Sequence, residues 1–260
     1  MIDKNAPKPQ SYYNQKYFRC LPTPFCSGCG NGIVLNAFAR AVDNLNINQK
    51  DILIASGIGC SSWIPSPFFK SDILHTTHGR AVAFATGAKL VNPNLRVVIF
   101  TGDGDCAAIG GNHLIHAARR NIGMLVLCVN NFTYGMTGGQ VAPTTPEKAL
   151  SSTTPYGNFE EPFDLCSLVA SAGAVYVARW TTYHVRQLIK AIEKGLQKKG
   201  FSFIEVISQC YTYYGRRNEF KDSTDIMLWF KNNSSTKGDK KILVGEFVDI
   251  ERKELSCKVK

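Results

Sequence analysis

The sequence lacks several features that define common protein classes. Its N-terminus has no apolar segment followed by a small-residue cleavage site, so we expect no export and a cytoplasmic location. No apolar stretch is long enough to span a membrane, and no internal repeat or low-complexity tract is present. The 260 residues are 44% hydrophobic and 19% charged, which is typical of a globular chain with one large domain.

Positive charge exceeds negative charge, with 30 Lys and Arg against 20 Asp and Glu, a formal net charge of +10. Such a surplus favours nucleic acid, an anionic cofactor or an acidic protein as a partner. The basic residues are scattered and form no aromatic-interleaved run of the kind that binds RNA. We therefore expect no nucleic-acid partner and no membrane partner.

Apolar periodicity predicts an alternation of strands and helices. Short apolar runs bounded by turn residues predict buried strands at 51–56, 95–101, 124–129, 175–178 and 201–207. Apolar residues recur every three to four positions over 32–45, 80–90, 112–121, 163–172 and 182–198, which predicts helices. The alternation predicts an α/β fold with a doubly wound parallel sheet covered on both faces.

Two segments fall outside this alternation. Residues 132–162 are rich in Thr, Gly and Pro, and so long a connection is typical of a binding loop or an interface. Residues 231–260 are lysine-rich and contain an apolar stretch, 242–250, that is suited to a strand. We predict one domain over 1–230 and a basic tail over 231–260 that packs on a partner subunit.

A glycine turn with two carboxylates follows one predicted strand. Gly102-Asp103-Gly104-Asp105 imitates a dinucleotide-binding loop, but its carboxylates would repel a pyrophosphate. A bridging cation would remove the conflict, and Mg²⁺ prefers oxygen ligands such as those of Asp103 and Asn131, which follow neighbouring strands. A solvent-facing turn beside an unrelated Asn-rich turn is the alternative.

The Gly-Asp-Gly turn, followed after a helix and a strand by Asn-Asn, resembles the diphosphate motif of thiamine diphosphate enzymes. The resemblance implies that the side chains of Asp103 and Asn131 and the carbonyl oxygen of Thr133 bind Mg²⁺. It also implies that the cofactor is lined by Gly102, Gly104, Asp105, Gly135 and Met136.

The nine cysteines cannot all pair as disulfides, and a reducing compartment argues against a disulfide scaffold. Cys26 and Cys29 form a Cys-x-x-Cys that suits a redox pair, although a turn-rich stretch rather than an apolar strand precedes it. Zinc would need two more ligands, and only His75/His78 and His113/His116 have a short spacing. An iron–sulfur cluster completed by Cys60 and Cys210, each after a predicted strand, is the third alternative.

Several motifs occur together in one order over about residues 20 to 220. They are Cys-x-x-Cys, Gly-Ile-Gly-Cys-Ser-Ser, His-Gly-Arg, Gly-Asp-Gly-Asp, Ile-Gly-Gly-Asn-His, Tyr-Gly-Met-Thr-Gly-Gly-Gln and a late single Cys. This series resembles the β subunits of 2-oxoacid:ferredoxin oxidoreductases. The resemblance implies a [4Fe-4S] cluster on Cys26, Cys29, Cys60 and Cys210. It also implies contacts with thiamine diphosphate from Ile58, Gly59, Cys60, Ser61 and His78, of which His78 has an alternative as a helix-start residue.

The resemblance implies the oxidative decarboxylation of a 2-oxoacid to acyl-CoA and CO₂, with electrons passed through the cluster to ferredoxin. Thiamine enzymes also need a carboxylate, usually Glu, at the aminopyrimidine ring, and this chain has no Glu before Glu147. We therefore expect an α subunit, with γ or δ subunits in some assemblies, to supply that Glu and the coenzyme A contacts. No catalytic residue is assigned to this chain, although His78 is a candidate.

The substrate prediction depends on two segments, 74–80 and 134–140, which look most like the 2-oxoglutarate branch. Trp63 stands where relatives often place Lys or Arg, so pyruvate and branched-chain 2-oxoacids stay open as substrates. The alternative functions are a non-redox thiamine decarboxylase subunit, an iron–sulfur electron carrier and a basic interaction module.

Overall fold

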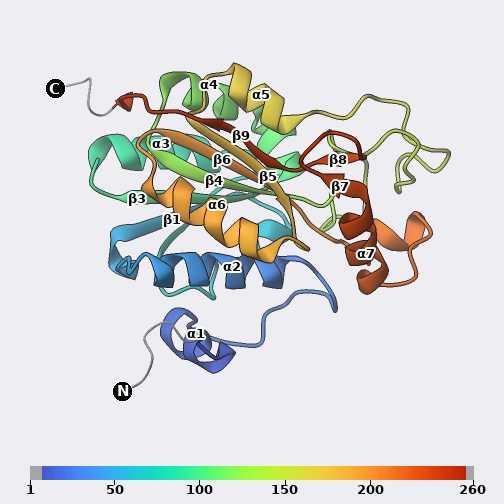
Figure 1. Ribbon diagram of the computed structural model, residues 1–260, viewed down its shortest axis with the longest axis horizontal. Helices are drawn as coiled ribbons and strands as arrows, with labels where there is room; N and C mark the ends of the chain where they lie inside the picture. The colour runs from blue at the N-terminus through green and yellow to red at the C-terminus, as the bar shows by residue number, and fades with distance from the viewer. Residues whose placement is uncertain (1–7, 256–260) are drawn as a thin grey trace.

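A seven-stranded sheet forms the centre of the protein in the computed structural model, which describes residues 8–255 (Figure 1). The strands lie in the order β2-β1-β3-β4-β6-β5-β9, and every neighbouring pair is parallel except β5 with β9. The bounds are β1 Ile52–Ser56, β2 Asp72–His75, β3 Arg96–Gly102, β4 Met124–Asn130, β5 Tyr176–Thr181, β6 Phe201–Ile207 and β9 Gly245–Asp249. The predicted doubly wound α/β sheet is confirmed.

Helices cover both faces of this sheet (Figure 1). One layer contains α1 Gln10–Tyr17, α2 Asn31–Asn44 and α6 Val185–Gln197, and the other contains α3 Ala81–Val91, α4 Gly111–Arg120 and α5 Leu165–Ser171. Alternate residues of each strand face opposite layers. In β3, Val98 and Phe100 pack with α2, while Val97 and Ile99 pack with α3 and α4. Both faces of the sheet are therefore buried, which explains the uninterrupted apolar runs in its strands.

Several elements were not predicted. Helix α1 has no apolar stripe and buries only Tyr13 and Tyr17. Strand β2 is four residues long with polar residues at both ends, so it lacks the apolar run that marked the other strands. Helix α7, Ser223–Asn233, lies with a small second sheet of β7 Ser234–Ser235 and β8 Ile242–Leu243.

The C-terminal segment belongs largely to the main domain. The apolar stretch at 242–250 contains β9, which pairs with β5 of the same chain, and α7 crosses the predicted boundary at residue 230. The predicted strand is thus present, but its sheet partner is this chain and not another subunit. Contact between the remaining surface of this segment and a partner stays a prediction.

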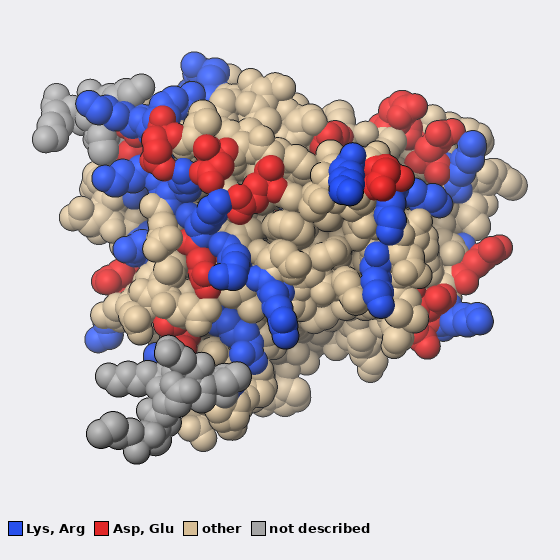
Figure 2. Space-filling model, in the orientation of Figure 1, with Lys and Arg blue, Asp and Glu red and all other residues tan. Residues whose placement is uncertain are grey.

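The charge surplus is not gathered on one side of the face shown in Figure 2, where positive and negative side chains lie intermixed. Ion pairs join the region of α6 to that of β9: Lys194 contacts Glu246 and Asp249, and Lys198, just after α6, contacts Asp249 and Glu251, the latter just after β9. Such exposed pairs contribute little stability each. Among the described residues, no helix has the length and apolarity needed to cross a membrane.

A buried carboxylate joins α1 to α2. The Asp43 side chain is 2% exposed and accepts hydrogen bonds from Lys16 at 2.8 Å and from Tyr17 at 2.8 Å. Burial alone would raise the pKa of Asp43, but the hydrogen bonds from Lys16, Lys8, Tyr12 and Tyr17 outweigh it and hold that pKa well below its usual range.

We expect Asp43→Asn to lower the free energy of unfolding at pH 7 by about 2 kcal/mol, because hydrogen bonds to a charged group are lost. The carboxyl pKa is depressed in the folded state, so its stabilisation is complete above the unfolded pKa of about 4 and is lost as the pH falls further. Urea titrations should show a larger deficit at pH 7 than at pH 3, because the folded-state pKa lies so low that part of the stabilisation persists at pH 3. Asp51→Asn, at an exposed carboxylate, is the control, and an equal deficit there would contradict the prediction.

Candidate functional site

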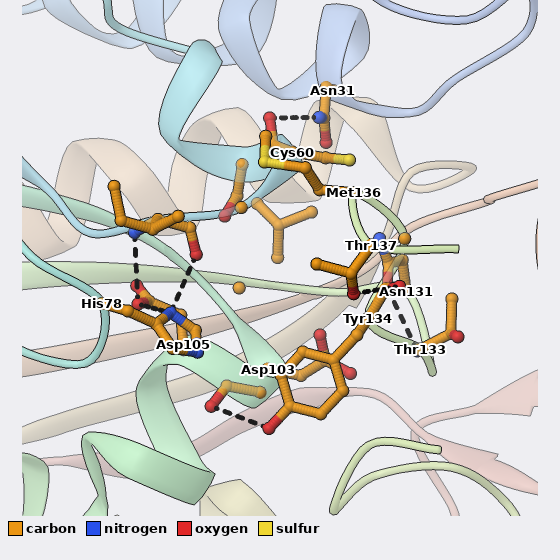
Figure 3. A pocket seen from close by; sticks show the side chains of 17 residues that line it. Asn31, Cys60, His78, Asp103, Asp105, Asn131, Thr133, Tyr134, Met136 and Thr137 are labelled. Carbon is orange, nitrogen blue, oxygen red and sulfur yellow. Dashed lines mark hydrogen bonds and ion pairs between the residues drawn. The ribbon is translucent and has the colours of Figure 1, made fainter. Parts of the chain in front are cut away.

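A cleft opens where the order of the strands reverses. From β1 the chain moves to β2 on one side, whereas β3 lies on the other side of β1 and leads on to β4. The loops that follow β1 and β3 diverge, and ligands of open α/β sheets bind in such crevices. The cleft has a volume of about 720 Å³, including its open mouth. Its walls are Asn31, Ile58, Gly59, Cys60, Ser61, His78, Gly102, Asp103, Gly104, Asp105, Val129, Asn131, Thr133, Tyr134, Gly135, Met136 and Thr137 (Figure 3).

The three predicted magnesium ligands, Asp103, Asn131 and Thr133, all line this cleft. The Asp103 carboxylate is 3% exposed and accepts a hydrogen bond of 2.5 Å from the Thr144 hydroxyl. Burial raises the pKa of Asp103 to about 7, because the hydrogen bond from Thr144 offsets only part of the desolvation. Among residues 8–255, no Lys, Arg or His forms an ion pair with it. A buried carboxylate without a cationic side chain fits a bound cation.

The second carboxylate of the turn, that of Asp105, already accepts hydrogen bonds from protein donors. It accepts hydrogen bonds from the Gly79 amide at 2.6 Å, the Ile58 amide at 3.3 Å and the Thr101 hydroxyl at 2.6 Å. The His78 Nδ1 lies 2.7 Å from the same carboxylate (Figure 3). Asp105 therefore joins the loops after β1 and β2 to the loop after β3 and gives the cleft its shape.

Two glycines are required by close approaches in the cleft. A Cβ at Gly57 would lie 2.1 Å from a carboxylate oxygen of Asp105. A Cβ at Gly104 would lie 2.2 Å from the Tyr134 ring. One glycine of each motif is thus required by packing, Gly57 against Asp105 and Gly104 against Tyr134.

The four predicted cluster ligands come together at one side of the cleft. A Cβ on Gly135 would lie 3.5 Å from the Cys60 sulfur and 3.8 Å from the Cys210 sulfur. Burial, together with the neighbouring Cys210, Cys60 and Cys26 thiols, raises the pKa of Cys29 to about 12. Burial, with Cys210 and Cys26 nearby, likewise raises the pKa of Cys60 to about 11.

This arrangement bears on the alternatives for Cys-x-x-Cys. A reactive redox thiol has a lowered pKa, whereas that of Cys29 is raised. Within residues 8–255, no three His, Cys, Asp or Glu side chains are close enough to share one metal ion. Four neighbouring thiols that are too far apart for a single ion fit a larger group such as an iron–sulfur cluster. All eight cysteines in the described part of the chain are free thiols.

Known proteins share this fold and sequence. The family model "Thiamine pyrophosphate enzyme, C-terminal TPP binding domain" matches residues 57–206. The 2-oxoglutarate synthase subunit KorB of Methanocaldococcus jannaschii is 55% identical over 251 residues, which cover 92% of this chain and 93% of that protein. The 2-oxoacid:ferredoxin oxidoreductase subunit beta of a Sulfolobus species is 41% identical over 73% of this chain and 62% of its own length. The chain belongs to the β subunits of the 2-oxoacid:ferredoxin oxidoreductases.

A solved structure extends the likeness of this β subunit to three dimensions. The 2-oxoglutarate:ferredoxin oxidoreductase from Magnetococcus marinus, with 2-oxoglutarate, coenzyme A and succinyl-CoA bound, has a TM-score of 0.83 and 32% identity. The match covers 95% of this chain and 88% of that one. The family inferred from the motifs is confirmed, and with it a subunit of a thiamine diphosphate-dependent oxidoreductase that works with other subunits.

The β subunit also contains site residues that sequence reasoning missed. Asn31, at the start of α2, is buried and donates a hydrogen bond of 2.9 Å to the Cys60 carbonyl (Figure 3). Thr144 contacts Asp103 from a loop that has no regular structure. The only signal for Asn31 was its position directly after Cys-x-x-Cys-Gly, and Thr144 had none beyond its place in the long loop.

Proposed function

We propose that this β subunit binds thiamine diphosphate through Mg²⁺ in the cleft, carries a [4Fe-4S] cluster beside it, and acts on 2-oxoglutarate. The observation that carries the proposal is that Cys60 belongs to both sites. It lines the cleft, and its thiol lies with those of the other predicted cluster ligands. A cofactor in the cleft would therefore be next to an electron acceptor, as oxidation coupled to decarboxylation requires.

Different residues of the cleft would contact different parts of the cofactor. Asp103, Asn131 and Thr133 would bind the Mg²⁺ that neutralises the diphosphate. Ile58, Gly59, Ser61 and Met136 would form the walls against the rings, with His78 at the side of Asp105 (Figure 3). When bound, thiamine diphosphate would supply a carbon nucleophile for the keto group and an electron sink for the pair left behind when CO₂ departs, and the cluster would accept electrons one at a time.

The relatives support 2-oxoglutarate as the substrate. This support does not come from a Lys or Arg in the cleft of this chain that could bind the distal carboxylate. KorB proteins are named as 2-oxoglutarate synthase subunits, and the Magnetococcus enzyme holds 2-oxoglutarate, coenzyme A and succinyl-CoA. No Lys or Arg lines the cleft in the described part of this chain. The partner for the distal carboxylate of the substrate would therefore come from the α subunit.

The α subunit is also needed for chemistry at the pyrimidine ring. No Glu lines the cleft among residues 8–255, and the Asp105 carboxylate is occupied by the surrounding loops. The α subunit would supply the activating Glu and the contacts with coenzyme A, and ferredoxin would receive the electrons. The proposal places this assembly in the cytoplasm, where reducing conditions keep thiols free for a cluster.

The test is the composition and activity of anaerobically purified protein. We expect about four iron and four sulfide per chain, binding of thiamine diphosphate only with Mg²⁺, and no 2-oxoacid oxidation until the α subunit is added. The complex should turn over 2-oxoglutarate faster than pyruvate or branched-chain 2-oxoacids. Zinc alone, or no metal, would favour the non-redox decarboxylase subunit, and oxidation by the chain alone would contradict the missing Glu.

A further inference from the structure

An ion pair joins β5 to β6 within the sheet, with its carboxylate buried and its guanidinium largely buried. Glu205 of β6 is 1% exposed, and Arg179 of β5 lies directly opposite it in the strand register. The Arg179 Nε donates a hydrogen bond of 2.6 Å to the Glu205 Oε2. Because burying charges is unfavourable unless they are paired and hydrogen-bonded, the contacts of this pair show what it holds in place.

Glu205 holds the start of the long loop that follows β4. The Asn130 side-chain amide donates a hydrogen bond of 2.8 Å to the Glu205 Oε1. The Asn130 Oδ1 in turn accepts a hydrogen bond of 3.0 Å from the Phe132 amide. Phe132 has a φ of 65°, a conformation that costs energy for a residue with a side chain. Asn131 and Thr133 flank this strained residue, so the Asn130 contact fixes the turn that presents both.

Arg179 holds the end of the same loop. Its Nη2 donates to the Asp164 carboxylate, which also accepts a hydrogen bond of 3.3 Å from the Ser167 amide and so caps α5. Inside the loop, the Thr145 hydroxyl donates to the Phe132 carbonyl at 2.7 Å, next to the Thr144 contact with Asp103. The Glu205–Arg179 ion pair thus contacts both ends of the segment 130–164, through Asn130 and Asp164. This segment contains the predicted magnesium ligands Asn131 and Thr133, and its Thr144 contacts the third, Asp103.

We infer that Glu205 and Arg179 are positioning residues that hold the 130–164 loop in its metal-binding conformation before Mg²⁺ arrives. The inference rests on the proposed function, because it concerns the affinity for that metal. Groups that orient metal ligands without touching the metal typically change metal affinity by 10- to 100-fold when they are altered. An ion pair that served only folding would change the stability of the protein and leave the affinity of the folded site unchanged.

The test compares Arg179→Lys and Asp164→Asn with the wild type, each in the full chain with its α subunit. A lysine ammonium is a point charge and lacks the guanidinium fork that reaches Glu205 and Asp164 together. Asn at position 164 still caps α5 but loses the charge that Arg179 contacts. We expect amide hydrogen exchange across 131–136 in the cofactor-free protein to be about tenfold faster in both variants. The Mg²⁺ concentration that half-saturates thiamine diphosphate binding should rise about tenfold.

Asp43→Asn is the matched control, because it also breaks a buried ionic network but lies between α1 and α2. It should lower stability and leave both the exchange over 131–136 and the Mg²⁺ requirement unchanged. Wild-type exchange rates and Mg²⁺ requirement in both loop variants, with only lowered stability, would overturn the inference. If the wild type bound no thiamine diphosphate with Mg²⁺, the proposed function would fail. Unchanged hydrogen exchange over 131–136 in the two variants would still show that Glu205 and Arg179 do not hold the loop.

Discussion

We expect Asp103→Asn to abolish magnesium-dependent binding of thiamine diphosphate while the chain stays folded. Asp103 is buried in the cleft without an ion-pair partner among the Lys, Arg and His side chains of residues 8–255, and a neutral amide is a much weaker ligand for a hard cation. Since altering groups that merely orient ligands costs 10- to 100-fold, loss of a direct ligand should cost at least about a hundredfold in Mg²⁺ affinity. Calorimetric titration of thiamine diphosphate with and without Mg²⁺ measures this directly.

The fold should survive because the substitution removes a buried charge without changing the side-chain volume. The new amide oxygen can still accept the Thr144 hydrogen bond, and the cost of burying an unpaired carboxylate disappears. Thermal unfolding of the cofactor-free variant should therefore match or exceed the wild type. Asp72→Asn, at an exposed carboxylate on β2, controls for a general charge effect. Unchanged Mg²⁺ dependence in Asp103→Asn would remove Asp103 from the metal site.

The sequence predicted the central strands well because burial on both faces leaves a pattern that needs no tertiary information. Residues 201–207 were predicted as a strand with the bounds that β6 has. The pairing of Asp103 with Asn131 followed from a general rule: the carboxyl ends of adjacent parallel strands meet at one edge, and β3 and β4 are adjacent. The ends of the strands, and the closeness of the motif residues that follow them, could therefore both be predicted from the sequence.

Contacts between distant segments were not predictable. Thr144 reaches Asp103 across 41 positions, and Glu205 reaches Asn130 across 75, and neither pair is marked by spacing or composition. The sheet partner of the C-terminal strand was not predictable for a similar reason. A short apolar stretch after a polar linker does not reveal which sheet edge it will pair with, and β9 closes the exposed edge of β5.

The proposed function divides the reaction between two chains. The groups that would bind the diphosphate and accept electrons lie on this chain, while no Glu lines its cleft among residues 8–255. If the proposal holds, cofactor loading and metal content can be measured on this subunit, and catalysis needs both subunits. This separation lets cluster variants be judged without relying on activity.

We expect Cys29→Ser to lose the cluster, with iron falling from about four per chain to none, and to keep the binding of thiamine diphosphate with Mg²⁺. Cys29 lies among the other three thiols but does not line the cleft. Because burial raises the pKa of its thiol to about 12, a stable thiolate there requires the positive charge of bound iron, which a serine hydroxyl does not replace. Ferredoxin reduction by the complex should fall to background.

Cys20→Ser is the control for Cys29→Ser, since Cys20 is an exposed free thiol shortly before Cys26 and belongs to neither site. It should retain iron, sulfide and ferredoxin reduction. A Cys29→Ser protein with full iron content would show that the cluster uses other ligands. Loss of thiamine diphosphate binding along with the iron would show that the cluster shapes the cleft through Cys60, whose carbonyl holds Asn31 and whose thiol faces the other ligands. Retained binding would mean instead that the cleft is formed by the protein alone, as the hydrogen bonds around Asp105 imply.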